Sequence, residues 1–194
     1  MIHPYSAYAV WKISETPDQL LAITKETPPE MHINKRSEWM VSRILVRYLC
    51  GLFDLPYSGM QNLDSGKPIL TGLNVEISIT HSFPVAAVLI NLRRPCGIDM
   101  ELRRSKLVKV QDKFLHERES QYKDDLEQLC RIWSAKEVLF KVHGEKNLSF
   151  KDEMLIEMSE KPDAAEGLIL KDGKETLVPI RYEQLFNYLL CYSI

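Results

Sequence analysis

The sequence predicts an α+β protein made of two similar halves, each a small antiparallel sheet packed with one long helix. Apolar residues recur with helical spacing in two segments, near residues 34–52 and 126–142. Short segments with the alternation or apolar runs of strands flank each of them. This order of strands, helix and strands, occurring twice, favours the α+β class. We place the halves at residues 1–94 and 95–194, although the sequence shows no direct repeat.

The first half is predicted to contain one long helix among strands. Residues 5–13 alternate loosely and indicate a strand. A helix is predicted from Asn34 to Leu52, with Gly51 near the expected stop. "LDSGKPIL" (63–70) is typical of a turn that leads into an extended segment. Two strands follow: "VEISIT" (75–80) alternates strictly, and "VAAVLIN" (85–91) is apolar enough to be covered on both faces.

The second half repeats this arrangement. "CGIDME" (96–101) indicates a strand, and residues 105–122 indicate a loop with a short helix. A helix with a stronger pattern is predicted over residues 126–142, and Gly144 lies just past its end as a stop signal. The remaining residues contain four pieces that are typical of strands: "MLIEM", "GLIL", "VPIRY" and "YLLCYS".

Composition limits the classes of function. The chain has 194 residues and a formal net charge of −2, so it is not built to coat nucleic acid or an anionic membrane. The N-terminal residues lack the pattern of a signal peptide, and no apolar run approaches the roughly 20 residues of a membrane helix. We therefore expect a cytoplasmic protein without nucleic-acid or membrane partners. Reduced thiols, rather than disulfides or a zinc site, are expected at four isolated cysteines: Cys50, Cys96, Cys130 and Cys191.

Asp99 and Glu101 form the first candidate site. Successive side chains of a strand point to opposite faces, so these two carboxylates share one face. Such a pair repels, and one member tends to keep its proton unless a cation lies between them. A solvated strand face, with Arg103 and Arg104 as partners, is the alternative interpretation.

The predicted helix over residues 126–142 adds a third carboxylate. Trp133, Glu137 and Lys141 are spaced four residues apart and share one helix face. An ordinary exposed pair of Glu137 and Lys141 would explain the same spacing. Together with Asp99 and Glu101, however, Glu137 completes an oxygen-ligand set that suits Mg²⁺ and a substrate phosphate.

Two smaller signals accompany the acids. In "SITHS" (78–82), His81 and Ser82 follow the predicted strand at a point where ligand-binding loops occur. In "GKP" (66–68), Lys67 lies between a flexible and a rigid residue. Either signal alone is also typical of an incidental surface residue.

In this order and separation, "SITHS", "GIDME" and "WSAKEVLFK" closely resemble the motifs of the 4′-phosphopantetheinyl transferases. "GKP", "KRSEWMVSRILVRYL" and "FLHERE" fit as well, so the resemblance extends from about Lys35 to Leu148. The length is similar to that of the surfactin-type branch, in which one chain holds both pseudo-twofold halves and is expected to be a monomer. "GEKNL" (144–148) departs from the family's Gly-x-Gly-Leu, which puts the shape of that loop in doubt.

The resemblance implies an enzyme of the holo-[acyl-carrier-protein] synthase type. It would move the 4′-phosphopantetheine arm of coenzyme A onto a serine of an apo acyl or peptidyl carrier protein and release adenosine 3′,5′-bisphosphate. Asp99, Glu101 and Glu137 would hold Mg²⁺, with Mn²⁺ as the alternative ion. The implied catalytic residues are Glu137, Lys141 and Asp99.

The resemblance also implies contacts with the coenzyme and with the carrier. Residues 1–94 would contribute to coenzyme A binding, and residues 95–194 would supply the metal-binding and catalytic groups. Coenzyme contacts are implied for Lys35, Arg36, Arg43, Lys67, Thr80, His81 and Lys141. A basic stretch is expected to steer the acidic carrier, unless it is only a solvated loop. Its members are Arg103, Arg104, Lys106, Lys109 and Lys113.

Two other functions remain open at this point. One is a different Mg²⁺-dependent phosphotransferase or a nuclease, because two spaced acids plus a distant glutamate are general metal chemistry. The other is a non-catalytic homologue that binds coenzyme A or a carrier protein.

Overall fold

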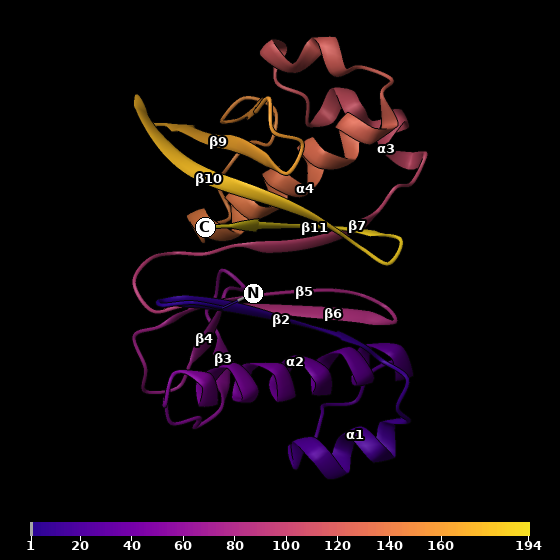
Figure 1. The fold of residues 1–194 in the computed structure, drawn as a ribbon, viewed down its shortest axis with the longest axis vertical. Helices are drawn as coiled ribbons and strands as arrows, with labels where there is room; N and C mark the ends of the chain where they lie inside the picture. Colours follow the sequence, from indigo (N-terminus) through magenta and orange to yellow (C-terminus); the bar gives the residue numbers. More distant parts are fainter. Residues whose placement is uncertain (1) are drawn as a thin grey trace. The chain divides into compact units, whose positions relative to one another are not determined.

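The computed structural model describes residues 2–194, with side chains from Pro4 onward. It has the predicted α+β class, and the chain divides into two compact units, Met1–Cys96 (unit 1) and Gly97–Ile194 (unit 2). Each unit holds an antiparallel sheet with one long helix against it (Figure 1). The two halves that we placed at residues 1–94 and 95–194 lie close to this division.

The sheet of unit 1 has the strand order β1-β2-β6-β5-β4-β3, and all its pairs are antiparallel. Every residue of β6 is buried, as its apolar run predicted. The short strand β3 lies outside the segments that the sequence indicated. The bounds are β1 Ile2–His3, β2 Ser6–Lys12, β3 Met60–Asn62, β4 Pro68–Leu70, β5 Glu76–Ser82 and β6 Val85–Asn91.

The long helix of unit 1, α2 (Ile33–Leu52), packs against β2 and β6. It buries Met40, Val41 and Leu45, which belong to the predicted apolar stripe. Gly51 lies inside the last helical turn rather than after it, and the residue with positive φ beyond the helix is Asp54 (φ 52°).

A shorter helix, α1 (Pro17–Thr24), packs on α2 and was not among the predicted elements. Its first turn carries a capping box: the Gln19 amide donates to Thr16 Oγ1, and the Thr16 amide donates to the Gln19 side chain. Pro17 starts the helix, where its missing N–H costs nothing. Thr16, Pro17 and Gln19 are therefore the sequence signal that could have predicted α1.

The sheet of unit 2 has the order β7-β11-β10-β9-β8, again antiparallel throughout. All four strand-like pieces of the C-terminal sequence lie in strands, and two of them coincide with β8 and β11. The bounds are β7 Ile98–Leu102, β8 Met154–Met158, β9 Ala164–Lys171, β10 Lys174–Leu185 and β11 Tyr188–Ser193.

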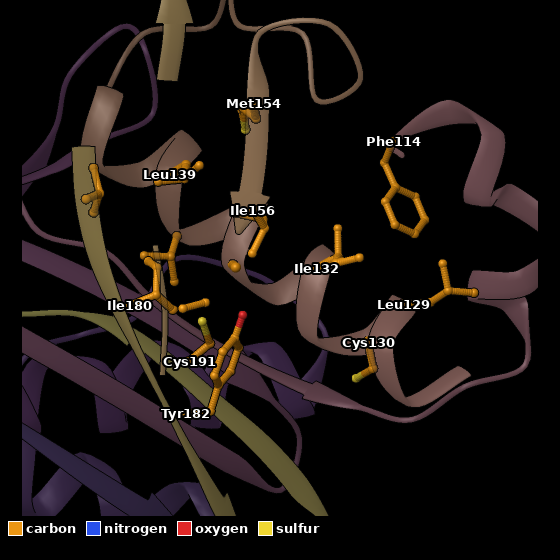
Figure 2. Packing of buried hydrophobic residues seen from close by; sticks show 14 of the residues in the cluster. Phe114, Leu129, Cys130, Ile132, Leu139, Met154, Ile156, Ile180, Tyr182 and Cys191 are labelled. Atoms are coloured by element: carbon orange, nitrogen blue, oxygen red, sulfur yellow. The ribbon is translucent and has the colours of Figure 1, made fainter. Parts of the chain in front are cut away.

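The long helix of unit 2, α4 (Leu126–His143), packs against β7, β8 and β11. Asp125 caps its first turn, and Gly144 (φ 77°) closes its last turn, as the stop signal predicted. Ile132 and Leu139 lie in the buried core with Met154 of β8 (Figure 2). Residues 105–122 form three short helical segments: α3 Lys106–Val110, η1 Gln111–Lys113 and η2 Glu117–Tyr122.

Gly97 allows β7 to approach α4 closely. A Cβ atom at Gly97 would overlap the carbonyl oxygen of Val138 in α4. The Gly97 amide also donates to Ser193 Oγ at 3.0 Å, which fixes the start of β7 beside the end of β11. Because β7 is held against the helix, the acids that follow Gly97 lie beside α4.

Candidate functional site

Asp99 and Glu101 lie on the face of β7 that contacts α4. Asp99 is buried: its Oδ1 accepts a bond from Lys141 Nζ at 3.0 Å, and its Oδ2 accepts one from Ser134 Oγ at 3.1 Å. Glu101 is partly buried and accepts a bond from Trp133 Nε1 at 3.3 Å. The two acids thus meet three side chains of α4, and two of these, Trp133 and Lys141, belong to the face that the helical spacing identified.

Glu137 is the third acid, and its environment disfavours a negative charge. Burial, followed by the charge of Asp99 and more weakly that of Glu101, raises the pKa of Glu137 to about 7, although Lys141 opposes the shift. Burial and the charge of Asp99 also raise the pKa of Glu101. The three carboxylates therefore repel one another.

Lys141 is the cation beside these acids. Its Nζ donates to the backbone oxygen of Ile98 at 2.7 Å and to Asp99 at 3.0 Å. About a quarter of its side chain is exposed. In this arrangement Lys141 partly compensates the charge of Asp99.

The donor set fits a divalent cation by its chemistry. Within residues 2–194, no group of three or more His, Cys, Asp or Glu side chains is already arranged to hold a metal ion. Carboxylate oxygens are nevertheless the ligands that Mg²⁺ prefers, and a cation would remove the repulsion that raises the pKa values of Glu101 and Glu137. Asp99, Glu101 and Glu137 are the residues that would hold it.

A pocket of about 590 Å³ opens beside Glu101. Its wall is mainly apolar and includes the aromatic rings of Phe114, Trp133 and Phe150. Three members of the basic stretch line it as well: Arg104, Lys106 and Lys113. The stretch is therefore divided, because Arg103 instead lies 3.6 Å from Glu127, and Lys109 does not line this pocket.

In unit 1, a cavity of about 500 Å³ brings together three predicted coenzyme-binding residues, Lys35, Arg43 and His81. The guanidinium of Arg43 lies 3.3 Å from the centroid of the Trp39 ring, which also lines the cavity. The prediction that His81 follows the strand is wrong: β5 continues to Ser82, because His81 and Ser82 still pair with β6.

Each of these three basic side chains lies beside a carboxylate. Lys35 Nζ and His81 Nδ1 lie 2.8 Å and 3.3 Å from the same oxygen of Glu38, and Arg43 Nε lies 3.4 Å from Glu26. Glu38 is buried and also accepts a bond from the Phe83 amide at 3.0 Å. Sequence reasoning assigned no role to Glu38, and its spacing of three residues from Lys35 was the available signal.

Three other predicted coenzyme contacts lie outside this cavity. Lys67 pairs with Glu76 at 2.5 Å, although its neighbours in sequence line the cavity. Thr80 is buried on the face of β5 opposite to His81. Arg36 does not line the cavity either, and its buried Nε has no hydrogen-bond partner in the described residues.

In unit 2, sequence reasoning missed Ser134 and a buried ion pair between Lys136 and Glu119, whose atoms lie 2.7 Å apart. Both residues of the pair belong to quoted motifs, "FLHERE" and "WSAKEVLFK", but nothing in either motif reveals that they meet.

Comparisons with known proteins bear on the family of the chain. Within residues 2–194, no helix has both the length and the apolar character needed to cross a membrane. No curated protein matches the chain. A family model described as "4'-phosphopantetheinyl transferase superfamily" matches residues 95–191, half of the chain, which include all three carboxylates and Lys141. The chain therefore belongs to the 4′-phosphopantetheinyl transferase superfamily, whose members transfer phosphopantetheine from coenzyme A to carrier proteins.

Proposed function

We propose that this protein is a Mg²⁺-dependent enzyme of the holo-[acyl-carrier-protein] synthase type. It moves the 4′-phosphopantetheine arm of coenzyme A to a serine of an apo acyl or peptidyl carrier protein. One observation carries the proposal: Glu137 lies partly buried beside two further acids and Lys141 within the segment that matches the family. Because one chain holds two α+β units, we also assign it to the surfactin-type branch, as a monomer.

In the proposed reaction, the carrier serine oxygen forms a bond to the β-phosphorus of the coenzyme diphosphate. The bond from that phosphorus to the bridging oxygen breaks, and adenosine 3′,5′-bisphosphate leaves with the electron pair. The serine proton passes to Glu137, directly or through a water that Glu137 orients.

The remaining residues of unit 2 hold and compensate charge. When bound by Asp99, Glu101 and Glu137, Mg²⁺ (or Mn²⁺) would supply charge neutralisation and orientation of the diphosphate. Lys141 donates to the oxygens of the leaving bisphosphate, where charge develops. Its bond to the Ile98 carbonyl fixes the position from which it does so.

Unit 1 is proposed to bind the 3′-phosphate and adenine region of the coenzyme. The cavity lined by Lys35, Arg43 and His81 supports this, because a guanidinium can donate two parallel hydrogen bonds to a phosphate. Trp39 holds the Arg43 guanidinium at the cavity wall. The contacts proposed for Arg36, Lys67 and Thr80 rest on the family resemblance.

The carrier protein is proposed to dock at the pocket beside Glu101. Carrier proteins of this family are usually acidic, and Arg104, Lys106 and Lys113 supply a complementary positive rim. The apolar wall would accommodate the hydrophobic contacts of the carrier near its serine. Docking there would place that serine close to the acids of β7.

An intact-mass assay tests the proposed function. The protein is incubated with coenzyme A, Mg²⁺ and an apo carrier protein, and a gain of one phosphopantetheine per carrier is expected. A carrier with its serine changed to alanine is the control. Absence of a gain with several carriers, together with cleavage of DNA or phosphoesters, would instead support a different metal-dependent enzyme. Coenzyme A binding that is indifferent to Glu137→Gln, without transfer, would indicate a non-catalytic homologue.

A further inference from the structure

Lys136 and Glu119 form an ion pair that the proposed chemistry does not use. Neither side chain has any exposed surface, and Lys136 Nζ lies 2.7 Å from Glu119 Oε2. Removing two charges from water is expensive, and apolar residues of similar size are often as stabilising as a buried pair. The pair therefore calls for an explanation other than stability.

The ammonium of Lys136 connects two separate segments of unit 2. Besides Glu119, it donates to the backbone oxygens of Phe114 at 2.6 Å and Phe150 at 2.8 Å. These three acceptors match the three hydrogens of an ammonium group. Glu119 is fixed in turn, because it accepts bonds from the His116 and Ile156 amides at 2.8 Å and 2.7 Å.

The two tethered residues hold Trp133 between their side chains. The Trp133 ring centroid lies 5.2 Å from that of Phe114 and 5.4 Å from that of Phe150. All three rings line the pocket beside Glu101. Trp133 Nε1 donates to the Glu101 carboxylate at 3.3 Å, so the orientation of the indole affects the orientation of Glu101.

We propose that Lys136, held by Glu119, is a positioning residue for the wall of the pocket beside Glu101, where the carrier is proposed to dock. Its bonds to the Phe114 and Phe150 carbonyls fix the two rings that enclose Trp133 and thereby orient both the pocket wall and Glu101. Apolar residues could fill the same space but could not tie two backbone carbonyls to one point. This role rests on the proposed function, because the pocket is assigned to the carrier there.

A pair of variants separates the effect of the tether, meaning the bonds from Lys136 Nζ to the Phe114 and Phe150 carbonyls, from the effect of the Glu119 charge. Glu119→Gln removes the negative charge but leaves Lys136 Nζ able to donate to both carbonyls. Lys136→Met in the Glu119→Gln background removes the tether and leaves no unpaired charge in the core. We expect the double variant to raise the KM for the carrier at least fivefold above that of Glu119→Gln. The KM for coenzyme A should rise by a smaller factor.

A spectroscopic readout follows the tether without any activity. The chain has three tryptophans, so 5-fluorotryptophan labelling gives three ¹⁹F resonances, and Trp133→Phe identifies that of Trp133. In the double variant, the Trp133 resonance should shift or broaden, while those of Trp11 and Trp39 in unit 1 should not change. If wild type transferred no arm to any carrier, the proposed function would fail, but this comparison would still test the tether.

Two outcomes overturn the proposal: an unchanged Trp133 resonance in the folded double variant, or a carrier KM equal to that of Glu119→Gln. If the double variant shows no cooperative thermal unfolding, Trp133→Phe takes its place. This variant keeps an aromatic ring but cannot donate to Glu101. It should raise the carrier KM several-fold and the KM for coenzyme A by a smaller factor, and an unchanged carrier KM would contradict the proposal.

Discussion

The candidate sites of the two units treat charge in opposite ways. In the cavity of unit 1, both lining cations lie against a carboxylate: Lys35 pairs with Glu38, which also lies beside His81, and Arg43 pairs with Glu26. In unit 2, three carboxylates lie around the Lys141 ammonium, and the pKa values of two of them are raised. The lining of the unit 1 cavity is thus close to charge balance, whereas the three acids of the unit 2 site carry more negative charge than Lys141 compensates.

This difference indicates what each site requires from a ligand. A phosphate that enters the unit 1 cavity must compete with Glu26 and Glu38 for the same cations, so the net free energy that favours its binding is smaller. A divalent cation that enters unit 2 removes an existing repulsion, so its binding is linked to stability. The predictions below test this contrast, beginning with the largest expected effect.

Glu137→Gln should reduce the kcat for arm transfer about a thousandfold, because amide nitrogen and oxygen cannot accept the serine proton. The measurement is the initial rate of carrier modification by intact mass. Glu127→Gln, on the exposed first turn of the same helix, is the matched control and should stay within twofold of wild type. Comparable losses in both variants would show that Glu137 has no special role.

Without metal, the folded chain should lose stability as the pH rises from about 5 to about 7. Over this range the folded state keeps the proton of Glu137, whose pKa is about 7, while the unfolded state, with a usual value of 4.5, has released it. The free energy of unfolding should therefore fall by up to about 3 kcal/mol, a penalty fully present above pH 7.

Urea unfolding of wild type and Glu137→Gln in EDTA at several pH values measures this penalty. The variant should be the more stable protein at pH 8, and the difference should shrink toward pH 5. A difference in the free energy of unfolding that does not change with pH would mean that burial and the neighbouring charges do not raise the pKa of Glu137.

Arg43→Ala should raise the KM for coenzyme A about thirtyfold, because it removes a charge-assisted bond to phosphate worth about 2 kcal/mol. The KM for the carrier should not change. Arg47→Ala is the matched control, because Arg47 lies one turn further along α2 and donates to the Ile23 carbonyl outside the cavity. Equal effects of the two substitutions on the KM for coenzyme A would contradict the proposal that the coenzyme binds in this cavity.

Arg104→Glu should raise the KM for the carrier about tenfold and leave that for coenzyme A unchanged, because it reverses a charge on the pocket rim. The comparison is Arg103→Glu, since Arg103 pairs with Glu127 instead of lining this pocket. Arg103→Glu is expected to raise the KM for the carrier less than Arg104→Glu does. The steering role would be refuted if Arg103→Glu had the larger effect, or if salt did not weaken the difference.

Much of the fold could be predicted because its elements have strong local periodicity. The helix with Gly144 at its end and the alternating segment at 75–80 are both present. The end of β5 was misplaced because its polar residues are held by pairing with β6, which hydrophobicity does not report. β3 was missed for a similar reason, since three residues pair with β4 across a long turn.

The acids of the candidate site were predictable because periodicity sets their directions. A period of two places Asp99 and Glu101 on one strand face, and a period near four places Glu137 and Lys141 on one helix face. The partners of these and the other site residues were not predictable. Glu38 and Phe83 are 45 residues apart, and Lys136 and Glu119 are 17 apart, so only the tertiary fold brings them together.

Binding of Mn²⁺ in the presence of coenzyme A tests most directly whether Asp99, Glu101 and Glu137 share one divalent cation. Electron paramagnetic resonance of free Mn²⁺ gives both the stoichiometry and the affinity. We predict one ion per chain for wild type, with the Kd raised at least tenfold by Glu137→Gln and by Asp99→Asn but not by Glu127→Gln. Unchanged Mn²⁺ affinity in both acid variants would contradict the shared site.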